Sequence, residues 1–345
     1  MSVDRRVFVS AVGQDTNVGD SVLRRGYLDA LRTVGQIHVL VSGTSDDYRD
    51  GLGLREEDIA YDARDTWWSD AYTAAERGPV VVAFNAGEMQ LNRTFALSYA
   101  RHAHLIRRAK RRGGFGVHLG MGIRSDSAWR VPVAAMLRVC DEVAWRDPSS
   151  RSWVGVGRVA PDWAFSFTST AAGADRNHVA VALRGDRDGR LDQWAETVAT
   201  TARERSLSPI VVVQVERDNE LAKQLGADYG WEVSEWRGGS HAKREAEIRA
   251  IYGASAAVIS DRLHALVIGA TEGAVPVAYA PTSVDKSRRT LAGVGLGEFF
   301  VPYDAKPADA IPRIGGLLER GAFVSERLAE ARENLATLTS QVAAR

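Results

Sequence analysis

The sequence contains one cysteine, no net charge and no long apolar run. Cys140 is the only cysteine, so no disulfide can form within the chain. Lys plus Arg and Asp plus Glu both number 44, which argues against a general nucleic-acid binder because such domains carry a basic excess. No apolar run approaches the roughly 20 residues of a membrane-spanning helix, and the first residues show no signal-peptide pattern. We therefore expect a cytoplasmic protein that holds any anionic ligand by local charge.

Two further patterns are missing. The turn at residues 13–19 lacks the G-x-G-x-x-G spacing of a dinucleotide-binding loop. The closest pair of histidines, His102 and His104, lies two residues apart in an expected helix and therefore faces different directions. We expect no metal site and no cofactor.

The length and the order of apolar segments indicate two domains. The chain has 345 residues, of which 45% are hydrophobic, and it alternates expected strands and helices in both halves. Alternation of this kind predicts parallel sheets flanked by helices. A small, polar segment at Thr168–Asn177 is the best candidate linker. The fold class is therefore α/β with two Rossmann-like domains, at 1–170 and 178–324, followed by a C-terminal helix at 325–345. Ligands should bind in a cleft between the domains, at the carboxyl ends of the strands.

Hydrophobic periodicity places the individual elements. Strands are expected at 7–12, 37–41, 79–84, 114–119, 142–145, 156–160, 178–183, 209–214, 231–236, 257–259 and 275–279. Helices are expected at 20–33, 93–112, 127–140, 149–153, 193–203, 219–226, 243–252, 284–291, 307–320 and 325–343, and one more follows residue 261. Residues 42–72 show weaker periodicity. Pro312 makes the early turns of the 307–320 helix doubtful, because proline disrupts a helix interior.

The most informative stretch is residues 256–279, which reads as strand, sharp turn, helix and strand. Ser260 and Asp261 are both favourable helix N-cap residues. Arg262 and His264 then fall in the first helical turn, where backbone N–H groups and the helix dipole favour an anion. Arginine adds a bidentate clamp for an oxyanion, and histidine adds a group that transfers protons near neutral pH. Gly273 lies where a left-handed helix end is expected.

Other turns that follow strands carry further candidates. Asn17 and Gly19 tolerate a positive φ, and Asp20 is expected to cap the helix after them. Glu88 follows another strand and is either a base for a substrate hydroxyl or a helix cap. Arg146 follows a short strand and should point toward the cleft.

The residues beside Arg146 suggest how it is held. Asp147 is expected to orient Arg146, and Ser150 to cap the next helix. In the second half, Gln214 ends a strand, and Asp218 is either a helix cap or a ligand for an acceptor. Lys286 lies on a loop long enough to turn it back toward His264.

Several of these motifs resemble the polysaccharide pyruvyl transferase family. Residues 260–264 (S-x-R-L-H) and 273–279 (G-x-V-P-V-x-Y) are similar to its C-terminal signature. Residues 17–20 (N-x-G-D) resemble its opening, and residues 146–150 (R-D-x-x-S) resemble a central element. Asn85 and Ala86 depart from the family, because they replace glycines that are more often found there.

The resemblance implies a fold like that of the B-type glycosyltransferases. It also implies transfer of the pyruvyl group of phosphoenolpyruvate onto two hydroxyls of a sugar in a cell-surface or exopolysaccharide precursor, with release of phosphate. Phosphoenolpyruvate is then a donor substrate and not a cofactor. The residues that the resemblance places at the donor are Arg146, Arg262, His264, Lys286 and Ser260, with His264 and Arg262 catalytic. The residues expected on the acceptor side are Asn17, Asp20, Glu88 and Gln214.

Two other functions remain open from the sequence. A glycosyltransferase that uses a nucleotide sugar would have a similar architecture and a similar basic site. A non-catalytic saccharide-binding protein would bind glycan without releasing phosphate. The basic run at 101–112 is either a solvated helix face or a contact with an anionic membrane that carries a lipid-linked acceptor.

Overall fold

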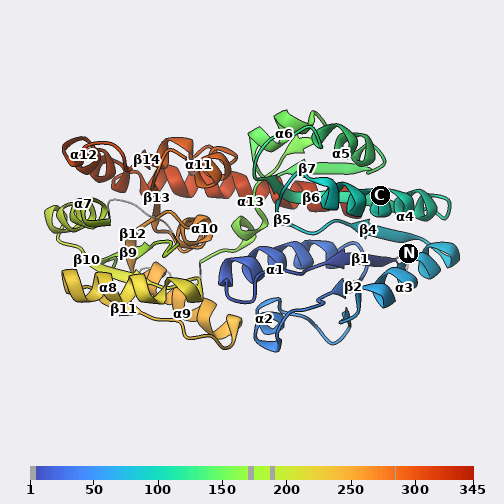
Figure 1. Cartoon of the computed structure of the whole chain (residues 1–345), viewed down its shortest axis with the longest axis horizontal. Coiled ribbons are helices and arrows are strands. Elements are labelled where there is room, and N and C mark those ends of the chain that lie inside the picture. Colours follow the sequence, from blue (N-terminus) through green and yellow to red (C-terminus); the bar gives the residue numbers. More distant parts are fainter. Residues whose placement is uncertain (1–4, 170–174, 187–190, 284) are drawn as a thin grey trace. The chain divides into compact units, whose positions relative to one another are not determined.

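The computed structural model describes residues 5–169, 175–186, 191–283 and 285–345 (Figure 1). The chain forms two compact units. Unit 1 comprises residues 1–15, 20–163 and 333–345, and unit 2 comprises residues 16–19 and 164–332. Part of the expected linker, at 170–174, lies outside the described residues.

Unit 1 is built on one parallel sheet. Its strands are β1 (Arg6–Ser10), β2 (Gln36–Leu40), β3 (Ile59–Tyr61), β4 (Val80–Ala83), β5 (Gly87–Met89), β6 (Phe115–Ile123), β7 (Glu142–Trp145) and β8 (Arg158–Val159). They lie in the order β3-β2-β1-β4-β6-β7-β8, and β5 pairs with β6. Every residue of β4 and β6 is buried, as expected for parallel strands covered by helices on both faces.

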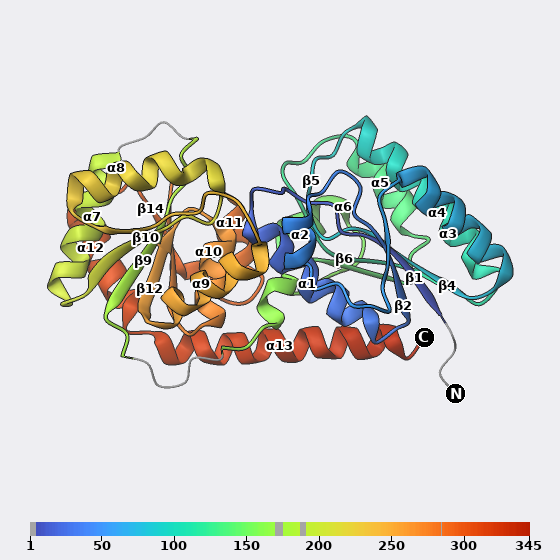
Figure 2. The same cartoon turned by 90° about the horizontal axis from the view of Figure 1, so that it is seen from below.

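The helices of unit 1 are α1 (Val18–Arg32), α2 (Asp46–Gly51), α3 (Arg64–Arg77), α4 (Arg93–Lys110), α5 (Arg130–Leu137) and α6 (Pro148–Val154). The first two residues of α1 group with unit 2. Helices α3 and α4 pack side by side (Figure 2). The apolar core beneath them is rich in aromatic side chains, among them Phe8, Trp67 and Trp145.

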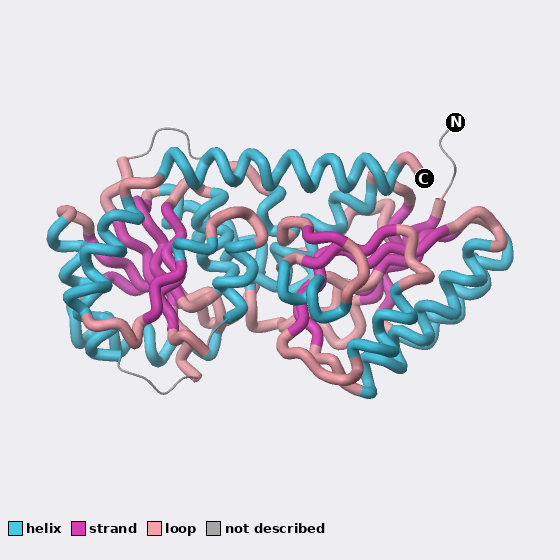
Figure 3. Tube along the Cα trace, turned by 90° about the horizontal axis from the view of Figure 1, so that it is seen from above, coloured by secondary structure: helices cyan, strands magenta, loops and turns pink. Residues whose placement is uncertain are grey.

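Unit 2 repeats the same plan. Its strands are β9 (His178–Ala182), β10 (Ser208–Val212), β11 (Glu232–Ser234), β12 (Ser255–Ser260), β13 (Val275–Ala280) and β14 (Phe300–Pro302). Its helices are α7 (Leu191–Glu204), α8 (Asn219–Tyr229), α9 (His241–Gly253), α10 (Leu263–Thr271), α11 (Asp285–Ala292) and α12 (Pro307–Leu318), and α13 (Gly321–Ala343) contributes to both units. The strand order is β11-β10-β9-β12-β13-β14, all parallel. Figure 3 shows the strands of each unit enclosed by helices.

The mixed α/β class and the two parallel sheets confirm the predicted fold class. Three details differ from the expected elements. Residues 42–72 contain α2, β3 and the first turns of α3, and β5 and β14 are additional strands of three residues each. Helix α12 starts at Pro307 and continues through Pro312, so the doubt about its early turns was wrong.

Both sheets reverse their strand order near the middle, between β1 and β4 in unit 1 and between β9 and β12 in unit 2. In open α/β sheets, ligands bind beside the carboxyl ends of strands at such a reversal. Each unit therefore has a defined edge at which a site is expected.

Candidate functional site

The turn after β12 lies at the strand reversal of unit 2. Ser260, the last residue of β12, is in register with Ala182 at the end of β9. The Ser260 hydroxyl donates to the Ala182 carbonyl at 2.5 Å and accepts from the Arg262 N–H at 2.8 Å. Because both bonds go to backbone groups, Ser260 fixes the turn that carries Arg262. The expectation that Ser260 caps the helix with its hydroxyl was wrong, because α10 begins at Leu263 and Arg262 holds the cap position.

Asp261 also serves a neighbouring turn and does not cap α10. Its carboxylate accepts a hydrogen bond from the Arg184 N–H, at 3.0 Å, in the loop after β9. At the other end of the helix, Gly273 has a φ of 87°, and the Ala274 N–H donates to the Gly269 carbonyl. The predicted left-handed end of α10 is therefore confirmed.

Arg262 is buried and paired with a carboxylate. Its exposed fraction is 8%, and its Nη2 donates to Asp218 Oδ1 at 2.5 Å. Burial lowers the pKa of Arg262, and the negative charge of Asp218 opposes that shift. Asp218 makes no helix-capping bond but accepts a second bond from the Gly185 N–H at 2.9 Å. Asp218 thus orients the guanidinium group of Arg262.

A small cavity of about 80 Å³ opens beside this guanidinium group. Its lining includes Asn17, Arg184, Gln214, Arg262, His264 and Lys286. Within the described part of the chain, two buried N–H donors here lack a hydrogen-bond partner, Gln214 Nε2 and Arg262 Nε. A buried unpaired donor is costly, so the cavity is suited to a ligand that accepts hydrogen bonds. The first turn of α10 adds backbone N–H groups and the positive end of its dipole.

His264 reaches this cavity because a glycine packs against it. A Cβ atom added to Gly19 would lie 2.5 Å from both Cβ and Nδ1 of His264. Neither Asn17 nor Gly19 has a positive φ, so the conformational reason given for both residues was wrong. Asn17 Oδ1 instead accepts from the Gly19 N–H at 3.1 Å. Residues 16–19 are held in unit 2 by a bridge between Asn17 and Val215.

Arg184 is a site residue that the sequence reasoning missed. It lines the cavity, and its guanidinium group is held by Asp186 through two hydrogen bonds of 2.9 and 2.8 Å. That pairing keeps the pKa of Asp186 well below its usual range. The available signal was position, because Arg184 follows β9, which neighbours β12.

Arg146 lies in unit 1 within a cluster of carboxylates. It is 2% exposed, and its Nη1 is 3.3 Å from Asp162 Oδ2. Its Nη2 lies 3.7 Å from Glu88 Oε1, and Glu88 also accepts two hydrogen bonds from Arg124. Of the two interpretations of Glu88, base or helix cap, the helix cap was wrong, because Asn92 caps α4.

Asp147 forms two hydrogen bonds with Ser150. It is the N-cap of α6, where its two carboxylate oxygens accept from the Ser150 N–H at 2.8 Å and the Ser150 hydroxyl at 2.6 Å. Asp162 pairs with Arg146. The expectation that Ser150 caps α6 was therefore wrong, because Asp147 is the cap.

Asp20 was also expected to cap a helix, but α1 begins two residues earlier, at Val18. The Asp20 carboxylate instead accepts from the Gln14 N–H at 2.9 Å and lies 3.4 Å from Arg24 Nη1. Asn85, where the family has glycine, accepts from Arg24 Nε and donates to the Val12 carbonyl. Asp20, Arg24 and Asn85 therefore stabilise neighbouring turns of unit 1.

The structure thus sorts the predicted site residues into two groups. Unit 2 brings together Asn17, Gln214, Ser260, Arg262, His264 and Lys286. Unit 1 brings together Glu88 and Arg146, with Asp20 elsewhere in that unit. Asn17 and Gln214, which were expected on the acceptor side, share the cavity of the expected donor residues.

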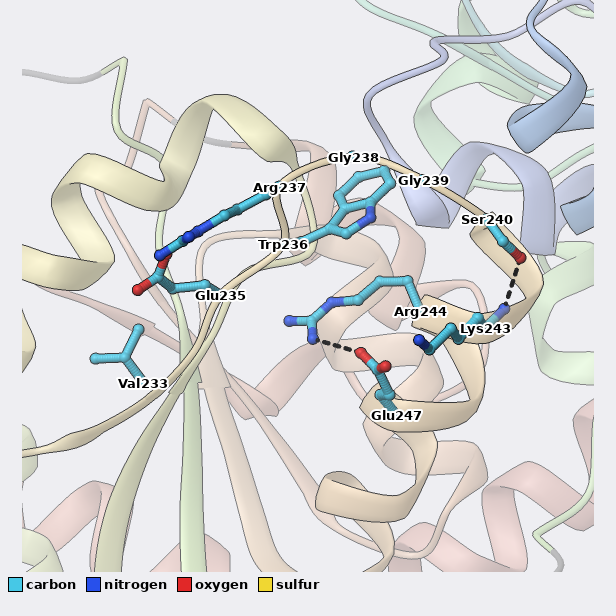
Figure 4. A pocket seen from close by; sticks show the side chains of 10 residues that line it. All are labelled: Val233, Glu235, Trp236, Arg237, Gly238, Gly239, Ser240, Lys243, Arg244 and Glu247. Atoms are coloured by element: carbon cyan, nitrogen blue, oxygen red, sulfur yellow. Dashed lines mark hydrogen bonds and ion pairs between the residues drawn. The ribbon is translucent and has the colours of Figure 1, made fainter.

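A second, larger cavity of about 540 Å³ in unit 2 lies after β11 (Figure 4). Its two arginines are already engaged. Arg237 pairs with Glu235, and Arg244 is 3% exposed and bonds to Glu247 and to backbone carbonyls. None of the residues that the sequence placed at the site lines this cavity, whereas several of them line the one beside Arg262.

The basic run at 101–112 ends helix α4 and is only partly available to a partner. Arg108 pairs with Glu76, Lys110 pairs with Asp141, and Arg101 stacks over Trp68. The remaining arginines, Arg107, Arg111 and Arg112, are exposed. Across the described ranges, no helix combines the length and the apolar character needed to cross a bilayer.

Comparison with solved structures bears on the fold. Anabaena HepE in complex with UDP matches with a TM-score of 0.60 at 12% identity, over 98% of this chain and 98% of that chain. MurG of Acinetobacter baumannii matches with a TM-score of 0.50 at 14% identity, over 99% and 100%. A mutant O-GlcNAc transferase of Thermobaculum terrenum matches with a TM-score of 0.53 at 14% identity, over 98% of this chain but 66% of that chain. At these identities the similarity shows the fold alone, which is that of the B-type glycosyltransferases and related epimerases.

Sequence comparison bears on the family. No curated protein sequence matches the chain significantly. The profile of the polysaccharide pyruvyl transferase family matches residues 17–283, a span that starts at Asn17 and includes Arg146, Arg262 and His264. Since that match covers well over half of the 345 residues, this chain belongs to the polysaccharide pyruvyl transferase family.

Proposed function

We propose that the chain transfers the pyruvyl group of phosphoenolpyruvate onto two hydroxyls of a sugar in a cell-surface polysaccharide precursor. The product is a cyclic ketal, and phosphate is released. Family membership supports the reaction class. The cavity beside Arg262 supports the donor, because its buried N–H donors without partners and its cationic lining suit a small anion.

The donor carries a phosphate and a carboxylate on a three-carbon frame. We assign Arg262 and Lys286 to its oxyanions in unit 2, together with the first turn of α10. The missed residue Arg184 lines the same cavity and adds a third cation. Arg146 is assigned to the donor by the resemblance of its motif, and Ser260 acts by holding the Arg262 turn.

The proton balance of the reaction defines what His264 has to do. The two sugar hydroxyls lose two protons in total. One of these is balanced by the proton that C3 of the donor gains as it becomes a methyl group. The hydroxyl oxygen attacks C2, phosphate leaves with the second proton, and the second hydroxyl oxygen closes the ring. We assign to His264 the delivery of the proton to C3 or the stabilisation of the departing phosphate. The remaining acceptor contacts are assigned to Asp20 and Glu88, with Asn17 and Gln214 at the border of the donor cavity.

The test is phosphate release from phosphoenolpyruvate in the presence of galactosides, glucosides and N-acetylmannosaminides. His264→Ala should abolish the release while circular dichroism and the melting temperature stay near those of the unchanged protein. A variant with a near-normal rate would remove His264 from the mechanism. Absence of phosphate release with every acceptor in the panel would argue against the proposed donor.

A nucleotide-sugar glycosyltransferase is the second candidate, favoured by the similarity of the whole chain to HepE solved with UDP. The two candidates differ in the ligand that stabilises the folded protein. Binding raises the melting temperature by mass action, so phosphoenolpyruvate should raise it and UDP-glucose should not. The opposite result would favour the glycosyltransferase. We also propose that the exposed arginines at the end of α4 contact an anionic membrane when the acceptor is lipid-linked.

A further inference from the structure

Unit 1 contains a cavity of about 290 Å³ to which no role has been assigned. We call it the aromatic cavity. It lies where β1, β2 and β4 end, beside Ser10, Leu40 and Phe84, and beneath the first turns of α3 and α4. This is the strand reversal of unit 1, the edge at which an open α/β sheet binds ligands.

The floor of the aromatic cavity consists of buried rings. Trp67, Trp68, Phe84 and Tyr99 line it, and each is at most 5% exposed. Ring faces and edges of this kind contact the C–H groups of a ligand without demanding charge. The volume is close to the lower end of the range of about 300–1,000 Å³ for ligand pockets, which suits one ring and not a chain of rings.

The mouth of the cavity is polar but nearly uncharged. Ser98 and Thr94 lie exposed on the first turns of α4, and Asn85 borders them. Arg64, at the start of α3, is the single formal charge among the lining side chains. Arg64 can pair with a single charged group, whereas the other polar side chains at the mouth offer hydrogen bonds to hydroxyl groups.

His102 adds one directed acceptor to this lining. Its Nδ1 is 2.8 Å from the Ser98 carbonyl oxygen. Since a carbonyl oxygen only accepts, Nδ1 must carry the proton, and the lone pair of a neutral ring then lies on Nε2. The ring stacks on Phe84 at 4.4 Å between centroids and meets Trp68 edge-on at 4.8 Å, so its orientation is fixed.

His102 is neutral at pH 7, which leaves its Nε2 able to accept a hydrogen bond. Burial lowers the pKa of His102 to about 4. The imidazole is therefore neutral at pH 7, and Nε2 can accept a hydrogen bond from a ligand hydroxyl. It is a poor base, so this contact selects a ligand and does not remove its proton.

We propose that the aromatic cavity binds a neutral pyranose ring of the acceptor saccharide, with one ring hydroxyl donating to His102 Nε2. As a statement about the acceptor, this rests on the proposed function. As a statement about saccharide binding, it depends only on the residues of unit 1. The sugar ring lies over the aromatic floor, and its remaining hydroxyls face Ser98 and Thr94.

The test fills the cavity from its mouth. Ser98→Phe places a ring in the opening from an exposed helix position, and Ala100→Phe is the matched control at an exposed position of α4 that does not line the cavity. Titration calorimetry with methyl β-galactoside, methyl β-glucoside and methyl N-acetyl-β-mannosaminide measures binding to the full chain. We expect at least one glycoside to bind, Ser98→Phe to weaken its binding 10-fold or more, and Ala100→Phe to leave it within 2-fold.

A second variant tests the acceptor role of His102. His102→Phe keeps an aromatic ring in the stack and removes Nε2, so it should weaken binding of the preferred glycoside about 10-fold. Stabilisation by phosphoenolpyruvate should be unchanged in all three variants, because none of the three substituted residues lines the donor cavity. Circular dichroism and melting temperatures check that each variant is folded.

The outcomes separate this inference from the proposed function. Glycoside binding that Ser98→Phe abolishes supports the inference even if the protein releases no phosphate from phosphoenolpyruvate. Equal binding by the Ser98→Phe and Ala100→Phe variants, or turnover of the glycosides with an unchanged KM in Ser98→Phe, would overturn it. Failure of every glycoside to bind would overturn it as well.

Discussion

Gly19 and His264 are neighbours in space although 245 positions separate them in the chain. The sequence motifs identified both residues, but they explained the glycine at position 19 by its tolerance of a positive φ. The structure attributes it to contact, because an added Cβ atom would meet Cβ, Cγ and Nδ1 of His264 at 2.5–2.7 Å. A contact of this kind depends on the tertiary fold, so periodicity and turn propensity could not reveal it.

Substitution of Gly19 should therefore displace the imidazole group. Gly19→Ala is expected to cost about 1–3 kcal/mol of folding free energy through overpacking and to reduce phosphate release more than donor binding. Urea denaturation and steady-state kinetics measure the two effects. Gly316→Ala is the control, because a Cβ atom there meets open space and glycine is a poor helix residue. Normal kinetics in Gly19→Ala would show that His264 has room to move.

Asp218 was left from the sequence as either a helix cap or an acceptor ligand, and the structure makes it the partner of Arg262. Asp218→Asn keeps the shape and the oxygen that accepts from the Gly185 N–H but removes the charge that orients the guanidinium group. Small misplacements of a binding group cost up to about 100-fold in rate, and we expect kcat/KM for phosphoenolpyruvate to fall by 10–100-fold on that scale. Glu247→Gln, which changes a carboxylate beside Arg244, should leave kcat/KM unchanged. Equal kinetics in both variants would contradict the orienting role.

The candidate site was predictable where a basic side chain or a histidine follows the end of a predicted strand. Arg262, His264 and Lys286 line one cavity as the motifs indicated. Asp218, which pairs with Arg262, and Asp186, which pairs with Arg184, come from other strand ends and were not assigned these roles. Hydrogen-bond partners between distant turns depend on side-chain geometry, which a single sequence does not encode locally.

Among the elements, the buried parallel strands were the most predictable. Their apolar runs and bounding turns place β7 at residues 142–145 as expected, and β9 within one residue. Short elements were missed because three residues give too little periodicity, as in β5 and β14. The acidic stretch 42–72 hid α3, whose Trp67 and Trp68 are buried although its average composition is polar.

Helix α12 shows where a rule about proline was applied too strictly. Pro312 lies six residues into a helix of 12 residues, on its exposed side. The helix tolerates it because Ala310, Ile314 and Leu317 bury the opposite side. Packing of that apolar side outweighs the missing backbone hydrogen bond.

Replacement of this proline should stabilise α12. Proline in a helix interior costs about 3 kcal/mol relative to alanine, so Pro312→Ala is expected to raise the free energy of unfolding by about 1–3 kcal/mol. Thermal and urea denaturation measure the gain. Pro307→Ala, at the first helical position where proline is favourable, should give no gain. A loss of stability in Pro312→Ala would mean that the ring itself is needed for packing.

At the scale of the whole molecule, three neutral histidines are concentrated in unit 1. Burial lowers the pKa of His38 and of His102 to about 4, and that of His118 to about 3. Each contributes stability that is fully present above the unfolded pKa of about 6.5 and is lost as the pH falls toward the folded value. Unit 1 should therefore weaken in mildly acidic solution.

This pH dependence can be measured. Between about pH 6 and pH 4.5, the fully buried His118 should lower the free energy of unfolding by up to roughly 1.4 kcal/mol per pH unit, and His38 and His102 should add smaller slopes of the same sign. Urea denaturation across that range gives the slope, and His118→Gln should reduce it. The same substitution at the exposed His104 serves as the control. An unchanged slope in His118→Gln would show that His118 does not remain neutral in the folded protein.

The short segment at residues 16–19 has a practical consequence for anyone dissecting this chain. The Thr16 carbonyl accepts a hydrogen bond from the Glu216 N–H, and the Val18 N–H donates to the Gln214 carbonyl. Residues 16–19 therefore belong to unit 2, whose remaining residues begin at 164. A recombinant fragment that starts at residue 164 would leave the Gln214 carbonyl and the Glu216 N–H without these hydrogen bonds. It would also lack Gly19, against which His264 packs. A fragment of unit 2 should therefore include residues 16–19. They can be joined to its start as a short peptide, or a circular permutation can place them before residue 164.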